Sequence, residues 1–312
     1  MNIFEYTYDL VRQIPDGRVS SYGAVAEALG DIRASRAVGR MMNQNPDPDS
    51  MPCYKIVHSD GRLGGFGRGI ADKIRRLKKD NILVKNDHIV DFKKFFFDNF
   101  VTNYPLKKLR QEQIALSKKV NLKDDFTRIE SVAGIDIAYP NNEFDDASGA
   151  CIVMDYKTKQ VIDEQSVFAK TTFPYISTYL SYRELPVVQK LVERLTSKPT
   201  ALLIDGNGIL HPYCFGFASH VGVVYNIPTI GIAKSLLYGH VEDTVVKIHN
   251  DKKGYAVFSS PRATKPIYVS PGHCISFQTS LDIVHHLSRY KIPEPLRQAH
   301  ILAKRNLLSQ VR

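Results

Sequence analysis

Three carboxylates stand where ordinary packing does not explain a charge. Asp136 interrupts the apolar stretch AGIDIAY, Asp205 ends the apolar stretch ALLIDG, and Glu184 lies in YRELP at the expected start of a helix. A charged side chain in a sheet core is costly unless it is paired or binds a metal, and α/β folds build their sites at strand ends. Three oxygen donors without a nearby cysteine favour Mg²⁺ or Mn²⁺ over zinc. For each carboxylate taken singly, a helix cap or a salt bridge is the alternative.

Further polar side chains follow the predicted strands. Asp205 opens the stretch DGNGILHPYCFGFASH, which contains His211 and His220, and its glycines predict a close approach of the backbone to a ligand. Lys234 in GIAKS and His273 in YVSPGH each follow a short predicted strand. Either side chain could neutralise a phosphate or assist proton transfer. A structural role is the alternative for each histidine.

A lone cysteine, Cys53, follows a proline in the polar stretch NPDPDSMPCYKIVHSDG. Its surroundings leave three roles open: nucleophile, metal ligand or packing residue. The other cysteines, Cys151, Cys214 and Cys274, are far away and form no C-x-x-C pair, so we expect neither a zinc site nor a disulfide framework. Cys151, inside the apolar stretch GACIVMDY, is expected to pack in a buried strand.

The first hundred residues read as helical and rich in loops. Helical spacing predicts helices over 4–14, 20–30 and 35–45, with serines at the start of the second helix and Gly30 at its end. Ser35 is expected to cap the third helix. Two short helices joined by a tight turn are typical of a helix-turn-helix.

The third predicted helix carries Arg36 and Arg40 one turn apart, beside small residues. Small residues let a helix approach DNA closely, and the arginines can then reach phosphates or bases. An ordinary surface arginine pair fits this spacing equally well.

The second part of the chain alternates predicted strands and helices, which indicates a mixed α/β domain. Residues 87–104 lack clear periodicity and are expected to be a connection, so we place the boundary near residue 100 and predict domains over 1–100 and 101–312. Adjacent antiparallel strands are expected over 131–139, 149–156 and 159–169, helices over 185–195 and 215–226, and buried strands over 200–206 and 228–233.

Composition restricts the class of protein. The 312 residues are 43% hydrophobic and 24% charged, as in globular proteins, and the net charge of +10 favours a polyanionic partner. No apolar run reaches 18 residues, and the N-terminus does not read as a signal peptide. We therefore expect a soluble cytoplasmic protein without a membrane partner. Protein partners are not predicted by the sequence.

Several stretches from residue 104 to 310 resemble endonuclease V: GIDIAY, PYISTYLSYRELP, DGNGILHPYCFGFASHVGV, PTIGIAKS, YVSPGH and PEPLRQAH. The resemblance implies an RNase H-like fold and a nuclease dependent on Mg²⁺, with Mn²⁺ as a substitute. Such a nuclease cuts the strand that carries deoxyinosine, at the second phosphodiester 3′ to the lesion. By matching motif, Asp136, Glu184 and Asp205 correspond to the metal-binding carboxylates, with His273 close to them.

The same resemblance assigns residues that contact DNA. Tyr175, within PYIS, corresponds to a wedge that fills the gap left by an extruded base. His211 and Lys234 fall on further active-site positions. Ser177 and Thr178 depart from the family's usual PYIP-type wedge, which alters the wedge's shape rather than the chemistry. Backbone amides over 206–208 are expected to read the edge of the hypoxanthine base.

Residues 3–85 resemble the DNA-binding domain of O6-alkylguanine-DNA alkyltransferase, through IPDGRVSSYGAVAEALG, SRAVGRMMNQNP, PCYKIV and GRLGGFGRG. The resemblance implies a mainly α, winged helix-turn-helix-like domain. Cys53 then corresponds to the residue that accepts the alkyl group irreversibly, and Asn45 supports its loop. Arg36 replaces the flipped guanine in the base stack, and Tyr22 pushes the base out.

Two departures concern how the thiol is ionised. The family's histidine after the cysteine is Tyr54 in this chain, and by spacing the family's glutamate falls near Asp80. An ordinary thiol has a pKa of about 8.5, and a tyrosine, with a pKa of about 10, is a weaker base than histidine. Cys53 is therefore expected to react slowly, or to depend on a helix dipole or a bound water.

Together these resemblances predict a bifunctional DNA repair enzyme, both a deoxyribonuclease V and a methylated-DNA–protein-cysteine methyltransferase. Its expected partners are DNA containing deoxyinosine and DNA containing O6-alkylguanine. Two alternatives stay open. The N-terminal domain could be a non-catalytic lesion sensor that directs the nuclease, or the nuclease could act mainly on inosine in RNA.

Overall fold

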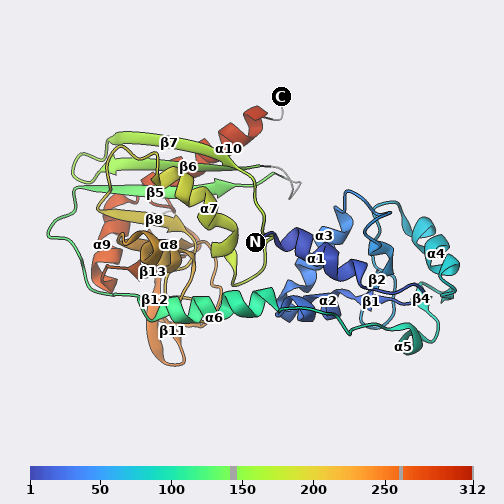
Figure 1. Cartoon of the computed structure of the whole chain (residues 1–312). Helices are drawn as coiled ribbons and strands as arrows, with labels where there is room; N and C mark the ends of the chain where they lie inside the picture. Colours follow the sequence, from blue (N-terminus) through green and yellow to red (C-terminus); the bar gives the residue numbers. More distant parts are fainter. Residues whose placement is uncertain (141–145, 260–262, 311–312) are drawn as a thin grey trace. The chain divides into compact units, whose positions relative to one another are not determined.

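The chain forms two compact units in the computed structural model, which describes residues 1–140, 146–259 and 263–310. The first unit is Met1–Gln111 together with Thr172–Ser177, and the second is Glu112–Thr171 together with Thr178–Arg312. Figure 1 shows the elements of both units along the chain. Within the described ranges, no helix has the length and apolar character needed to cross a membrane.

The first unit consists of short helices and two small pairs of strands. Its helices are α1 (Ile3–Arg12), α2 (Tyr22–Leu29), α3 (Ser35–Asn43), α4 (Ile70–Lys79), α5 (Phe92–Phe95) and the first part of α6 (Pro105–Ser117), with 3-10 turns η1 (Ile32–Ala34) and η2 (Cys53–Lys55). Strand β1 (Ser20–Ser21) pairs in parallel with β2 (Ile56–Val57), and β3 (Val84–Lys85) pairs antiparallel with β4 (His88–Ile89). The helical character predicted for this part of the chain is confirmed.

The two short helices expected around a tight turn are α2 and α3. The Ser21 hydroxyl accepts a backbone N–H at 3.0 Å at the start of α2, and Gly30 ends this helix with a φ of 106°, which favours glycine. The cap predicted at Ser35 is wrong. Turn η1, capped by Asp31, runs directly into α3, so the backbone of Ser35 is already helical.

The segment 87–104 is not a free connection. The Val19 N–H donates to the Phe95 carbonyl at 2.9 Å, and the Phe97 N–H donates to the Val19 carbonyl at 2.7 Å. Phe95 also packs against the apolar cluster of the first unit. These contacts are made inside the first unit, which extends beyond residue 100 to Gln111.

The second unit is a mixed nine-stranded sheet with helices on both faces (Figure 1). The strands are β5 (Ser131–Ala138), β6 (Ala147–Asp155), β7 (Val161–Ala169), β8 (Ala201–Asp205), β9 (Thr229–Ala233), β10 (His240–Glu242), β11 (Val245–Ile248), β12 (Asp251–Val257) and β13 (Ile267–His273), in the order β10-β11-β12-β13-β9-β8-β5-β6-β7. The predicted antiparallel neighbours β5, β6 and β7 are confirmed, and β8 joins both β5 and β9 in parallel.

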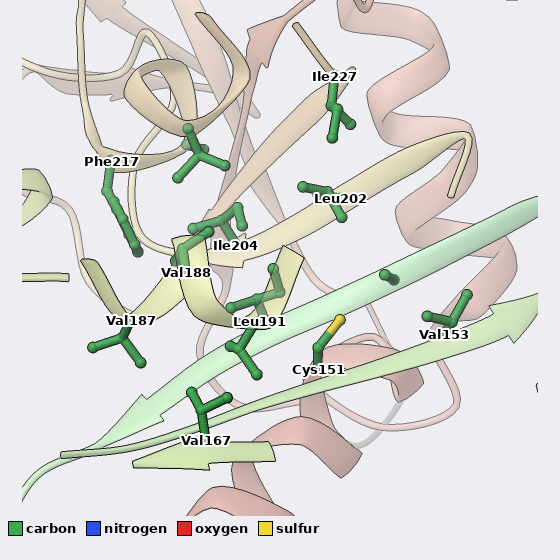
Figure 2. Packing of buried hydrophobic residues seen from close by; sticks show 14 of the residues in the cluster. Cys151, Val153, Val167, Val187, Val188, Leu191, Leu202, Ile204, Phe217 and Ile227 are labelled. Atoms are coloured by element: carbon green, nitrogen blue, oxygen red, sulfur yellow. The ribbon is translucent and has the colours of Figure 1, made fainter. Parts of the chain in front are cut away.

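Two apolar layers hold this sheet between helices. One face packs against α7 (Leu180–Val192) and α8 (Phe217–Tyr225), and Figure 2 shows the cluster there, which includes Val153, Val188, Leu202 and Cys151. Cys151 is fully buried, so its predicted packing role is confirmed. The other face is covered by α9 (Phe277–Leu287) and α10 (Glu294–Gln310).

Helix α10 approaches strand β5 unusually closely at Gly134. A Cβ atom added there would lie 2.3 Å from the backbone nitrogen of Leu296 and 2.3 Å from the carbonyl carbon of Pro295. Because backbone atoms cannot swing aside as side chains do, only glycine permits this crossing. The position of α10 on the sheet therefore depends on the absence of a side chain at residue 134.

We expect Gly134→Ala to destabilise the second unit, because the added methyl group must push α10 away from β5. Overpacking of this kind costs about 1–3 kcal/mol, and calorimetry should record a lower Tm. Gly65→Ala adds the same methyl group where no atom lies within 4 Å and serves as the control. An unchanged Tm for Gly134→Ala would contradict the close crossing.

Candidate active sites

The register of two parallel strands brings two aspartates together. Ile135 of β5 lies opposite Ile204 of β8, so the next residues, Asp136 and Asp205, stand side by side at the same edge of the sheet. The carboxyl group of Asp205 is close enough to act on the pKa of Asp136. Glu184, on α7, is also buried, and all three carboxylates line a cavity of about 200 Å³. The predicted grouping of Asp136, Glu184 and Asp205 is present.

Burial and the crowding of like charges together determine the electrostatics of this carboxylate cluster. Burial, followed by the charge of Asp205, raises the pKa of Asp136 to about 8, and burial with the two neighbouring carboxylates holds the pKa of Glu184 well above its usual range. Lys234, just after β9, donates to Asp205 at 2.5 Å. Arg183 is a second cation, acting on Glu184, but two cations do not balance three carboxylates. Protons or a further cation must neutralise the remainder.

A histidine that the residue pattern did not single out completes the carboxylate cluster. His300, on α10, bonds through Nδ1 to Asp136 Oδ2 at 2.8 Å. Burial is the main cause that lowers the pKa of His300. Its only sequence signal is its place in the motif PEPLRQAH.

His273, expected close to the carboxylates, is not brought to them. Strand β13 pairs His273 with Thr229 at the start of β9, whereas Asp205 lies opposite Ile232 near the end of β9. The Nδ1 atom of His273 instead accepts the backbone N–H of Asn121 at 3.2 Å. The antiparallel direction of β13 therefore carries His273 to the opposite end of these strands, where its bond is structural.

The other residues expected to contact DNA have varied surroundings. His211 is buried, its Nδ1 accepts the Tyr213 N–H at 3.3 Å, and it does not line the cavities at the carboxylates. Tyr175 is 48% exposed between two buried residues, Phe173 and Ile176, in the segment that groups with the first unit. An exposed aromatic ring held between buried neighbours is suited to contact with a base.

Two of the backbone amides expected to read a base are already in use. The Gly206 N–H donates to the Ile232 carbonyl at 3.0 Å, and the Gly208 N–H donates to the Ser270 hydroxyl at 2.9 Å. Gly208 is also packed so closely that an added Cβ would lie 2.2 Å from the Pro271 carbonyl oxygen. These glycines serve the packing of the sheet, and neither amide is free to bind a base.

The donor set of the carboxylate cluster suits a hard cation. Among the residues described, no three His, Cys, Asp or Glu side chains stand ready as a ligand set for a metal ion. In the present arrangement Lys234 is bonded to Asp205. Carboxylate oxygens with unbalanced charge are nevertheless the ligands that Mg²⁺ and Mn²⁺ prefer. A divalent cation held by Asp136, Glu184 and Asp205 would replace the protons that now reduce their repulsion.

A second reactive group lies in the first unit, at η2. Cys53 is only 2% exposed although its neighbours in sequence are polar. The side-chain amide of Asn45 donates to Cys53 Sγ at 3.0 Å and to the Met51 carbonyl at 2.9 Å, which fixes the turn that carries the thiol. Burial raises the pKa of Cys53, so the resting residue is a neutral thiol.

Tyr54 contacts the expected acidic partner but does not act as a base. Its hydroxyl donates to Asp80 at 2.9 Å. Burial and this bond raise the pKa of Tyr54 far above its usual value, so the phenol keeps its proton. Tyr22, on which the charge of Cys53 acts, begins α2 and packs edge-on against His58, with the ring centroids 5.4 Å apart. Arg36 is exposed on α3.

Comparison with known proteins explains why two such sites share one chain. A "Bifunctional methyltransferase/endonuclease" of Picrophilus torridus is 38% identical over 300 residues, which are 96% of this chain and 95% of the relative. The chain belongs to the bifunctional methyltransferase/endonuclease family. A protein of the same description from Thermoplasma volcanium is 36% identical over 97% of this chain and 90% of its own length.

Each half of this bifunctional enzyme has its own match. The family model for endonuclease V matches residues 114–301, and that for the DNA-binding domain of 6-O-methylguanine DNA methyltransferase matches residues 2–82. Endonuclease V of Ciona intestinalis, solved with a 23-mer DNA containing an inosine followed by a ribo-adenosine, has a TM-score of 0.62 and 28% identity, over 68% of this chain and all of that chain. Both predicted resemblances are confirmed, and the nuclease half belongs to a family of metal-dependent nucleases.

The carboxylate cluster predicts an unusual dependence of stability on pH. Because the pKa of Asp136 is higher in the folded chain (about 8) than in the unfolded chain (3.8), the folded state binds more protons between these values. In the presence of a chelator, Asp136 should therefore lower Tm as the pH rises from 5 to 8. His220 acts in the opposite direction below pH 6.5, because burial lowers its pKa to about 4. Asp136→Asn should reduce the loss of unfolding free energy that Asp136 causes over this pH range by at least about 1 kcal/mol, the equivalent of one pKa unit.

Calorimetry at several pH values measures this effect. Asp282→Asn, which neutralises an exposed carboxylate on α9, is the matched control and should keep the wild-type dependence. An Asp136→Asn variant whose Tm depends on pH as the wild type does would refute the raised pKa.

Proposed function

We propose that the second unit hydrolyses the strand of DNA that carries deoxyinosine, at the second phosphodiester 3′ to the lesion, with Mg²⁺ or Mn²⁺ as cofactor. The observation that carries this proposal is the buried cluster of Asp136, Glu184 and Asp205, with unbalanced negative charge, at the edge of the sheet. A relative in Ciona intestinalis was solved on DNA containing an inosine. An RNase H-like fold agrees with the parallel pairing of the strands that carry the aspartates.

In this proposal each residue has a distinct task. The bound cation would polarise the phosphate and favour in-line attack by water. His300 keeps Asp136 oriented through the 2.8 Å bond, and Lys234 offers its charge to the phosphate once Asp205 turns to the cation. Tyr175 fills the gap left by the extruded base, which is cheapest to unstack when it is poorly paired.

We further propose that Cys53 accepts the alkyl group of O6-alkylguanine in DNA. Support comes from its buried thiol, from the Asn45 bond to sulfur and from the match of residues 2–82 to the methyltransferase domain. Arg36, exposed on α3, would enter the base stack, and Tyr22 would push the base out, in a winged helix-turn-helix-like arrangement. Sulfur forms a bond to the alkyl carbon while the bond from that carbon to O6 breaks, so each Cys53 reacts once.

A nuclease that acts on inosine followed by a ribonucleotide is a second candidate. The Ciona intestinalis complex contains an inosine followed by a ribo-adenosine, so a ribose at this position fits at least one relative. Matched strands that differ only in this sugar distinguish the substrates. Faster cleavage of the ribose strand by a large factor would assign the activity to RNA, and equal or slower cleavage would assign it to DNA.

Asp136→Ala should lower cleavage of a deoxyinosine duplex in Mg²⁺ by at least about 100-fold, because removing even an outer-shell partner of a metal costs about 10- to 100-fold. Binding of the lesion duplex, followed by fluorescence anisotropy, should persist because the DNA contacts remain. Asp282→Asn controls for the loss of one carboxylate. Cleavage retained by Asp136→Ala would refute the metal assignment.

Incubation with excess O6-methylguanine duplex should add the mass of one methyl group to the protein, and peptide mapping should find it on Cys53. Cys53→Ala should gain nothing, whereas Cys214→Ala, which removes a different and less buried cysteine, should gain it as the wild type does. Tight lesion binding by the wild type without a gain in mass would make the first unit a sensor.

A further inference from the structure

Lys73, on α4, is a buried cation without a counter-charge. Its side chain is fully buried. Nζ donates to the carbonyl of Ile56 at 2.6 Å and to that of Gly64 at 3.1 Å. No carboxylate among the described residues forms an ion pair with it. A buried ammonium in such surroundings is costly, so its presence calls for a reason beyond packing.

Both carbonyls that hold Lys73 belong to the walls of the Cys53 site. Ile56 closes the turn η2, because its N–H donates to the carbonyl of Cys53 itself. Gly64 lies directly against Tyr22, since a Cβ added to Gly64 would fall 2.0 Å from the Tyr22 hydroxyl oxygen. The Lys73 amine is thus bound between the turn that carries the thiol and the tyrosine assigned to base extrusion.

The other groups that act on Cys53 are unsuited to take its proton. Asn45 is a donor to sulfur, and Tyr8 of α1 and Tyr22 of α2 both have a pKa raised chiefly by burial. Arg76 of α4 also acts on the thiol, but it is bonded to Asp49 at 2.8 Å and to Asp72 at 2.9 Å. An arginine in any case stays charged.

We propose that Lys73 is the proton acceptor for Cys53, in place of the histidine that follows the cysteine in the alkyltransferase family. The inference rests on the proposed alkyl transfer. A neutral lysine amine has two N–H donors and one lone pair, and the carbonyls of Ile56 and Gly64 match the two donors. The lone pair then remains for the thiol proton once Cys53 Sγ turns from Asn45 to the amine, whose charge already acts on the thiol.

The proton balance of the transfer closes. The thiol proton passes from sulfur to the Lys73 amine, and the thiolate bonds to the alkyl carbon as that carbon's bond to O6 breaks. The electron pair of the broken bond stays on guanine, which takes up the proton that Lys73 releases. Burial lowers the pKa of Lys73 to about 8, so a useful fraction is neutral near physiological pH.

The test is the rate of methyl transfer from an O6-methylguanine duplex between pH 6 and 10, followed by intact-protein mass in the full-length chain. The wild-type rate should rise with pH and level off near pH 8. Lys73→Met should be about 100-fold slower at pH 7, the usual scale of general-base catalysis, and its rate should keep rising beyond pH 8. Lys78→Met, on the exposed side of α4, should behave as the wild type does.

Rescue separates catalysis from structure. Adding Tyr54→His to Lys73→Met should restore most of the lost rate, with a plateau moved toward the lower pKa of histidine, because the family's base is then present beside Asp80. Binding of the O6-methylguanine duplex, followed by fluorescence anisotropy, should be equal in all four proteins and reports that the first unit is folded. Cleavage of deoxyinosine DNA reports the same for the second unit.

The outcomes are distinct. A wild-type rate and pH profile in Lys73→Met would overturn the inference, and so would a slow variant that keeps the wild-type plateau and gains nothing from Tyr54→His. A wild-type chain that gains no methyl group would refute the alkyl transfer itself, and the inference with it.

Discussion

Repulsion between buried carboxylates is the constraint on which the nuclease unit depends. Asp136 and Asp205 are neighbours in register on two parallel strands, and Glu184 faces them from α7. Burial and the neighbouring carboxylates raise the pKa of both Asp136 and Glu184. The unit tolerates this arrangement because Lys234 and His300 bond to the two aspartates. Part of the stability of the fold is thus given up to keep a high negative charge in one place.

That constraint reaches far into the packing. His300 contacts Asp136 only because α10 lies almost on the backbone of β5, and it can lie there only because residue 134 is glycine. The apolar layer in Figure 2 holds α7 against the sheet. Helix α7 carries Glu184. Elements with no reactive group therefore determine the geometry of the carboxylates. Changes in either apolar layer should affect catalysis as well as stability.

The sequence predicted residues whose chemistry conflicts with their surroundings. Asp136 and Asp205 were found because each breaks or ends an apolar strand, and Cys151 because its surroundings are wholly apolar. His300 was missed because a histidine on a mixed helix produces no such conflict. His300 reaches Asp136 only because α10 crosses β5 in the folded chain, and the sequence does not show this crossing. His273 was misplaced because a motif gives the order of strands along the chain, not the end of the sheet at which a residue arrives.

In the first unit, too, neighbouring residues predicted some helix ends but not the features that depend on tertiary contacts. The cap at Ser21 and the glycine at the end of α2 depend on a few neighbouring residues, so both could be predicted. Ser35 could not, because its role depends on whether a turn precedes it without a break. The phenylalanines after residue 90 have no helical or strand period, yet they pack in the core through contacts with Val19, more than seventy residues earlier. Tertiary contacts override local pattern in both cases.

The replacement of histidine by Tyr54 shows how one substitution can separate geometry from chemistry. The tyrosine keeps the hydrogen bond to an acidic residue, Asp80, and its ring packs against the apolar cluster and beneath the guanidinium of Arg76. Position and packing are therefore preserved. The proton affinity of an imidazole is not, because a phenol that donates to a carboxylate is held even more firmly in its protonated form. A cysteine retained beside such a residue must have its ionisation supported from another side of the site. In the first unit, α4 is the element that brings cationic side chains to it.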